Sequence, residues 1–205
     1  MSTFTLRPYE PRDLSAVYAI CLQTGDSGED ATHLYDDPDA LGHLYAGPYV
    51  RLEPHLASML EDERGVCGYI VGALDTQTFY RRYVNEWLPP LQATLPEPQG
   101  DPERWTRTER LYHQLHQPTL YFPLALHPYP SHLHIDLLPR AQGQGNGSRL
   151  IRRLLDTLKT RGSPGVHLGL GADNARAYHF YLKQGFHVLD ADPPQGALYM
   201  GQRLD

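Results

Sequence analysis

The stretch that decides the fold runs from Ser131 to Phe186 and reads SHLHIDLLPRAQGQGNGSRLIRRLLDTLKTRGSPGVHLGLGADNARAYHFYLKQGF. Polar and apolar residues alternate from His132 to Leu138, which predicts a strand with two chemically different faces. Pro139 ends this strand because proline cannot donate to a sheet ladder. A glycine-rich segment follows, and then leucine and isoleucine recur at helical spacing as far as Leu158. The stretch therefore predicts strand, glycine loop, helix, strand and helix.

The glycine loop, QGQGNG at residues 142–147, predicts an anion site. Glycine allows a positive φ and lets a ligand approach the backbone closely. The free N–H groups at the start of the following helix converge on one point, and the helix dipole favours negative charge there. A plain tight turn is the alternative, but one glycine would suffice for it. We therefore expect a phosphate or pyrophosphate at this loop.

Two common phosphate-binding folds fit poorly. A P-loop requires Gly-Lys-Ser/Thr, whereas Gly147 is followed by Ser148 and Arg149. A dinucleotide fingerprint is nearly met, and Asp173 follows the next strand, but that fold needs further strand–helix units. Little chain remains after Phe186.

The same residues carry a resemblance to a known family. The pattern Q-x-x-G-x-G, formed by Gln142, Gly145 and Gly147, resembles the acetyl-CoA pyrophosphate loop of the GCN5-related N-acetyltransferases (GNAT). Residues 174–186, NARAYHFYLKQGF, resemble the second motif of that family, N-x-x-A-x-x-F-Y-x-x-x-G-F. More narrowly, YPSHLHIDLLP at 129–139 resembles the branch related to the C-terminal domain of O-GlcNAcase, as do residues 65–75 and 87–91.

The resemblance implies an α/β fold in which a central mixed, twisted sheet is flanked by helices and its strands splay apart at the acetyl-CoA site. We expect residues 1–205 to form a single domain of this kind. A backbone N–H near Leu137 or Leu138 would bond the thioester carbonyl, and Gly169 and Gly171 would ease the opening of the gap. The coenzyme-binding residues implied are Leu137, Leu138, Gln142, Gly143, Gln144, Gly145, Asn146, Gly147, Ser148, Asn174 and Tyr181.

Three side chains are candidates for catalysis. Tyr181 matches the tyrosine that many family members place near the coenzyme sulfur, which makes it the expected general acid; a core aromatic is the alternative. Asp136 and His134 share the polar face of their strand with His132, and buried polar groups need partners. We expect Asp136 to be the base or amine anchor with His134 as its partner. Asn174 binds the coenzyme arm or caps a helix. The H-x-H pair alone is a weak metal signal, so no metal is expected.

Composition narrows the function class. The chain has 205 residues, 40% of them hydrophobic and 20% charged, and a formal charge of −6. These are globular values, and the negative charge argues against nucleic-acid binding. The two cysteines, Cys21 and Cys67, predict buried reduced thiols. No signal peptide or membrane-spanning run is recognised, so a cytoplasmic location is expected, and a homodimer is left open.

The remaining elements are predicted from periodicity and from proline and glycine. The Gly- and Pro-rich segment 25–54 is expected to be irregular with short helices. It either shapes acceptor choice or serves only as a connection. Pro89 and Pro90 are expected to stop a helix. The other predicted elements are a strand at 3–8, a helix at 14–24, a hairpin of 57–60 with 66–74, helices at 76–87 and 103–116, an apolar strand at 119–126 and a last strand within 196–204.

The sequence thus predicts an acetyl-CoA-dependent N-acetyltransferase that transfers the acetyl group directly to an amine, since no cysteine sits in a motif for a covalent intermediate. A non-catalytic acetyltransferase-like binding module is the main alternative. A transferase that uses a longer acyl-CoA is a second alternative. The acceptor amine is not readable from the sequence.

Overall fold

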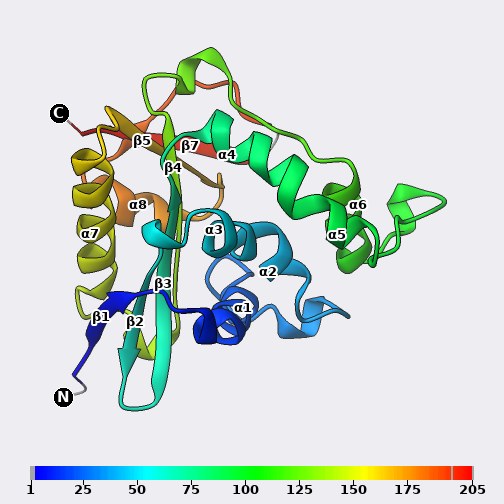
Figure 1. The fold of residues 1–205 in the computed structure, drawn as a ribbon, viewed down its shortest axis with the longest axis horizontal. Helices are drawn as coiled ribbons and strands as arrows, with labels where there is room; N and C mark the ends of the chain where they lie inside the picture. Colours follow the sequence, from blue (N-terminus) through cyan, green and yellow to red (C-terminus); the bar gives the residue numbers. More distant parts are fainter. Residues whose placement is uncertain (1–2, 195, 205) are drawn as a thin grey trace.

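The computed structural model describes residues 3–194 and 196–204 and places a seven-stranded sheet between helices (Figure 1). The strand order is β1-β2-β3-β4-β5-β7-β6; β4 and β5 run parallel and the other neighbours antiparallel. The strands are β1 (Thr5–Pro8), β2 (Ser58–Asp62), β3 (Gly65–Ala73), β4 (Ser131–Leu137), β5 (Gly165–Gly171), β6 (His187–Val188) and β7 (Ala197–Arg203). The helices are α1 (Leu14–Gln23), α2 (Ala40–Tyr45), α3 (Gly47–Leu52), α4 (Thr76–Arg82), α5 (Leu88–Gln92), α6 (Arg107–His116), α7 (Asn146–Thr160) and α8 (Ala175–Lys183). The predicted α/β architecture with a mixed sheet is confirmed.

Helices cover both faces of the sheet, with α7 on one side and α1, α2 and α3 on the other (Figure 1). The apolar stripe of α7 is buried against β2, β3 and β4 through Leu150, Ile151, Leu154 and Leu158. Gly72 of β3 allows this close approach, because a Cβ there would lie 3.1 Å from the Leu154 side chain. Alternation along β4 sends the odd-numbered side chains toward α7 and the even-numbered ones toward α1 and α3.

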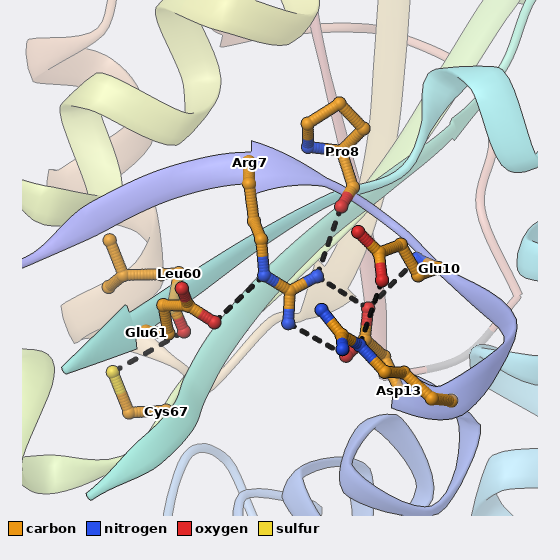
Figure 2. Close-up of polar contacts among 8 residues, drawn as sticks. Arg7, Pro8, Glu10, Asp13, Leu60, Glu61 and Cys67 are labelled. Carbon is orange, nitrogen blue, oxygen red and sulfur yellow. Dashed lines mark hydrogen bonds and ion pairs between the residues drawn. The ribbon is translucent and has the colours of Figure 1, made fainter. Parts of the chain in front are cut away.

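A charged cluster fastens the first strand to its neighbours (Figure 2). The Arg7 guanidinium on β1 donates to both carboxylate oxygens of Asp13, at 2.7 and 2.8 Å, and to Glu61 on β2 at 2.8 Å. Asp13 is only 4% exposed and stands immediately before α1. The bidentate bond from Arg7 lowers the pKa of the Asp13 carboxyl, although burial opposes this. The cluster therefore ties β1, β2 and the start of α1 together.

Two predicted helices have bounds that differ from expectation. Pro89 and Pro90 do not stop the helix that begins at Thr76: a π-helical turn at Tyr83–Trp87 leads directly into α5, which contains both prolines. Proline is tolerated there because the first N–H groups of a helix lack partners within it. The helix predicted from Glu103 begins instead at Arg107, where Thr106 and Glu109 form a capping box.

The apolar strand predicted for residues 119–126 is wrong. Only a 3-10 turn forms there, at Leu124–Leu126. Pro123 removes a backbone donor from the middle of the segment, which disfavours sheet pairing. The Tyr121 hydroxyl instead bonds the carbonyls of Ala191 and Asp192. The first and last predicted strands, the hairpin and the short helices of segment 25–54 are confirmed.

Candidate active site

The two parallel strands at the centre of the sheet separate after their first residues. β4 and β5 pair at Ser131 with Val166 and at His132 with His167, and their described pairing ends there. β5 remains paired with β7 as far as Gly171, so the later half of β4 faces an open gap. The predicted splaying of the strands is confirmed.

One of the two backbone amides singled out from the sequence faces this gap. The Leu138 N–H donates to the Cys67 carbonyl on β3 at 2.9 Å. In an antiparallel ladder, successive residues turn their peptide groups to opposite edges, so those of Leu137 turn toward β5. The Leu137 carbonyl accepts a bond from the Gln142 side chain at 2.8 Å. The Leu137 N–H therefore faces the gap, whereas the Leu138 N–H belongs to the sheet.

A cavity of about 770 Å³ opens on the gap and is lined from both faces of the sheet. We call its two halves the loop side and the α1 side, with residues 133–137 of β4 between them. The loop side is lined by Gln142, Gly143, Gly145, Gly147, Ser148, Asn174, Arg176, Ala177, Phe180 and Tyr181. The α1 side is lined by Cys21, Thr24, Gly25, Tyr35, Leu41 and Tyr45.

The glycine loop has the backbone that an anion site needs. Gly143 and Gly145 have φ values of 72° and 76°, in the left-handed region that L-residues rarely adopt. A Cβ at either position would meet no protein atom within 4 Å, so open space lies in front of the loop. The 15-residue helix α7 begins directly afterwards at Asn146, with its first N–H groups and its dipole directed at that space.

Some side chains of the loop hold it in shape rather than line the cavity. The Asn146 amide, 2% exposed, donates to the Ala141 carbonyl at 3.0 Å. The Gln144 amide donates to the Arg140 carbonyl at 3.1 Å. The side chains of Asn146, Gln144 and Leu138 all lie outside the cavity lining, whereas the other predicted coenzyme residues are part of it.

Helix α8 brings Tyr181 to the cavity. Asn174 caps this helix, its Oδ1 accepting from the Ala177 N–H at 3.0 Å. Tyr181 is 8% exposed and packs edge-on against Phe180 and Phe186, with ring centroids 5.2 and 5.5 Å away. Burial raises the pKa of the Tyr181 phenol, and the charge of Asp136 raises it further. The phenol therefore stays protonated at neutral pH and retains a proton to donate.

Arg176 is a residue of the site that the sequence analysis missed. From the first turn of α8 it donates to Gln142 at 3.1 Å and to the Ser27 carbonyl at 3.3 Å. Glu29 lies 3.9 Å away. Arg176 therefore joins the glycine loop to the turn that follows α1. Its place within N-x-x-A, two residues after Asn174, was the available signal.

The carboxylate of Asp136 is held by β3 rather than by its own strand. The Tyr69 hydroxyl donates to Asp136 Oδ2 at 2.5 Å, and the two residues are directly paired across β3 and β4. The expected partner, His134, is therefore replaced by Tyr69. Burial raises the pKa of Asp136, and the hydroxyls of Tyr69 and Thr24 partly offset this. A carboxylate with a raised pKa is a stronger proton acceptor.

His134 lies between aromatic rings. Its ring centroid is 5.3 Å from that of Tyr49 and 6.0 Å from that of Tyr45, both in edge geometry. Burial lowers the pKa of His134 to about 4, so the imidazole is neutral near pH 7. Asp136 is thus the carboxylate of the cavity, and His134 offers it a neutral polar wall.

The two cysteines are buried and free, as predicted. Cys21 lines the α1 side, and burial raises its pKa to about 12. Burial likewise raises the pKa of Cys67 to about 11. Both thiols are protonated at neutral pH and are poor nucleophiles in that form.

Metal-ligand clusters and membrane-spanning helices were both expected to be absent, and residues 3–194 and 196–204 can be described in both respects. No group of three or more His, Cys, Asp or Glu side chains in these ranges is arranged to hold a metal ion. No helix within them is long and apolar enough to cross a membrane.

Comparison with known proteins identifies the family. The chain is similar to the O-GlcNAcases of Rattus norvegicus and Mus musculus, each 29% identical over 204 residues, which are 98% of this chain but 22% of the relative. The chain therefore spans about a fifth of the length of these curated relatives. Among solved structures, SsHAT is 38% identical with a TM-score of 0.91, and 99% of each chain is covered.

More distant structures share the fold. YncA, a putative acetyltransferase from Salmonella typhimurium solved with acetyl-CoA, has a TM-score of 0.54 at 17% identity. The alignment covers 98% of this chain and 94% of the YncA chain. The ribosomal-protein-S18-alanine N-acetyltransferase of Escherichia coli has a TM-score of 0.53 at 17% identity, with 99% and 95% covered. Residues 29–186 match the model of the acetyltransferase (GNAT) family. The chain belongs to the GNAT acetyltransferase family.

Proposed function

We propose that this protein is an acetyl-CoA-dependent N-acetyltransferase that transfers the acetyl group directly to a primary amine. One observation carries the proposal: a single cavity passes through the gap between β4 and β5, with the glycine loop on one side and Asp136 on the other. Such a passage lets a donor and an acceptor enter from opposite faces and meet at the backbone of β4. We also propose that residues 1–205 work as one domain.

The loop side suits the coenzyme. The N–H groups at the start of α7 and the Arg176 guanidinium offer donors and positive charge to a pyrophosphate. The missing Cβ atoms of Gly143 and Gly145 leave room for it. The Leu137 N–H is placed to bond the thioester carbonyl, and Ser148 and Asn174 would complete the lining. Acetyl-CoA would supply a thioester whose acyl group can pass to an amine.

The residues of the chain would then manage charge and protons. The amine nitrogen forms a bond to the acyl carbon while the bond from that carbon to sulfur breaks. The Leu137 N–H stabilises the oxyanion that develops. Asp136 accepts the proton that the amine loses, and Tyr181 donates one to the departing sulfur. Protons balance because one is accepted on the α1 side and one is given on the loop side.

Direct transfer is favoured over an acetyl-cysteine intermediate. The high pKa of Cys21 leaves almost no thiolate at neutral pH. A second function, a non-catalytic module that binds the coenzyme or a partner, becomes the conclusion if binding occurs without turnover.

The test combines stability with turnover. A ligand bound only by the folded protein, at a hundredfold excess over its Kd, stabilises it by roughly 2.7 kcal/mol. Acetyl-CoA should therefore raise the melting temperature, and NAD should leave it unchanged. Thiol release from acetyl-CoA should then depend on an added primary amine, with equal amounts of thiol and N-acetyl product. A rise in melting temperature with NAD alone would favour a dinucleotide-binding site instead. A rise with acetyl-CoA but no product with any amine would favour the non-catalytic binding module.

A further inference from the structure

We infer that the α1 side takes a primary amine at the end of an unbranched apolar stem, in preference to amino sugars and other polyhydroxylated amines. This inference rests on the proposed function for the role of the cavity. It is carried by the side chains that line the α1 side and by the hydrogen bonds they already make.

Charge in the cavity is divided between its two halves. Among the lining residues, Arg176 and Asp136 carry full charges, and they belong to opposite ends: Arg176 beside Gln142 on the loop side, and Asp136 on the face of β4 that meets α1. An ammonium group is therefore attracted to the Asp136 end. One carboxylate matches one cationic centre, so a polyamine would leave its further charges without partners.

Part of the wall around Asp136 is apolar, next to the neutral imidazole of His134. Leu41 is 4% exposed and Cys21 is 4% exposed, and both line this half of the cavity. Thr24 also lines it, but its hydroxyl already donates to the Ile20 carbonyl at 2.8 Å. An apolar stem loses contact with water against such walls, which favours binding.

Aromatic rings complete these walls. Tyr35 and Tyr45 line the α1 side, and the Tyr45 ring is in edge contact with His134, two residues before Asp136 on β4. The faces of tyrosine rings attract ammonium ions, and their edges pack well against methylene groups. Tyr45 is thus positioned to guide the amine toward the carboxylate.

A sugar would bind poorly on the same grounds. Each buried hydroxyl of a sugar needs a hydrogen-bond partner, but the Thr24 hydroxyl already donates to Ile20 and Asp136 Oδ2 already accepts from Tyr69. That leaves the side chains of His134, Tyr35 and Tyr45 to serve the several hydroxyls of a sugar. A hydroxyl left unpaired lowers affinity on the order of tenfold. The lining of the α1 side therefore discriminates among acceptors by the polarity of the stem as well as by the amino group.

The test measures amine binding separately from turnover. Hexylamine, glucosamine and Nα-acetyl-lysine amide are titrated calorimetrically into the protein saturated with CoA, which has no acetyl group to transfer. Hexylamine should bind at least tenfold more tightly than glucosamine. Tighter binding of the lysine derivative than of hexylamine would point to a lysine side chain as the natural source of the stem, and the reverse order to a free amine; both support the inference. Equal or tighter binding of glucosamine, or no binding of either stem amine, would overturn it.

A variant pair ties the result to the site. Tyr45→Leu should weaken hexylamine binding roughly three- to thirtyfold, the worth of a cation–π contact, and leave CoA affinity unchanged. Tyr112→Leu, on α6 and outside the cavity lining, should change neither affinity. Repeating the titrations as rate measurements with acetyl-CoA separates the two proposals. Binding of hexylamine without thiol release would reject the transferase function and leave this inference standing. Fast acetylation of glucosamine would support the transferase function and overturn this inference.

Discussion

The loop side and the α1 side of the cavity are built in opposite ways. The loop side comes from one continuous stretch, residues 131–186, and much of it acts through the backbone, with Gly143 and Gly145 in left-handed conformations. The α1 side gathers Cys21, Leu41, Tyr45 and Asp136 from three separate elements and acts through side chains. A backbone site that serves one constant coenzyme leaves a local motif, whereas a side-chain site can change with the acceptor and leaves none.

The largest expected effect comes from breaking the loop side. Gly145→Val puts a β-branched side chain at a φ of 76° and into the open space before α7. Acetyl-CoA affinity should fall by on the order of 100-fold or more, measured by calorimetry on a folded variant. Gly162→Val is the matched control, since Gly162 has a φ of 85° and equally open surroundings but lies outside the cavity lining. Unchanged affinity in Gly145→Val would contradict the anion site.

Tyr181→Phe tests whether the loop side also supplies chemistry. The ring keeps its packing against Phe180 and Phe186 and loses only the hydroxyl. Acetyl-CoA binding should be retained while kcat falls by roughly 10² to 10⁴, the usual effect of a positioned acid. Tyr178→Phe on the same helix, outside the lining, should be nearly silent. Equal kcat values in the two variants would make Tyr181 a core residue only.

Asp136→Asn tests the α1 side, and its effect should fall on the acceptor. The amine KM should rise roughly 30-fold or more, because a buried cation loses its counter-charge, while coenzyme affinity is unchanged. In the wild-type protein, activity should fall at acid pH as Asp136 is protonated, and this acid limb of the pH profile should be absent from Asp136→Asn. Tyr69→Phe sharpens this result: the bond from Tyr69 lowers the Asp136 pKa, so its removal should move the acid limb to higher pH. A limb that stays in place in both variants would assign the base elsewhere.

The smallest expected effect concerns stability. Burial lowers the His134 pKa to about 4, below its ordinary value of 6.5, so the unfolded chain binds a proton that the folded chain refuses. His134 thus contributes stability above pH 6.5 that is lost as the pH falls toward 4, by at most roughly 3 kcal/mol. Burial raises the pKa of Asp136 and so opposes this trend.

The measurement is the free energy of unfolding between pH 7.5 and 4.5 in His134→Gln and in the wild-type protein. The variant should show the shallower slope. His127→Gln, at an exposed position, is the control and should follow the wild type. Parallel slopes in all three proteins would show that His134 is solvated.

The contrast between the two sides also explains what the sequence could predict. Positive φ at Gly143 and Gly145, the start of α7 and the Asn174 cap follow from residue types at fixed local spacing, and each is present. The opening between β4 and β5 was expected from the resemblance rather than from any residue.

Long-range packing was the part that could not be predicted. The bond between Tyr69 and Asp136 joins residues 67 positions apart, and β-pairing register alone brings them together. Arg176 reaches Ser27 across 149 positions. Alternation places Asp136 on the polar face of its strand but does not specify which neighbour faces it, and proximity in the sequence favours His134 over Tyr69. The proline at 123 outweighed the apolar pattern of its segment for a local reason that was visible in the sequence.

In the proposed reaction the backbone of β4 receives the acyl group at the gap, at Leu137 and not at Leu138. The direct measurement is the amide spectrum of protein labelled with nitrogen-15 leucine, titrated with acetyl-CoA and, separately, with CoA. The Leu137 amide should shift more with acetyl-CoA than with CoA, because only the former brings a carbonyl to it. The Leu138 amide, bonded to Cys67, should stay nearly still with both. Equal shifts of Leu137 with the two ligands, or a larger shift at Leu138, would show that the Leu137 N–H does not bond the thioester carbonyl.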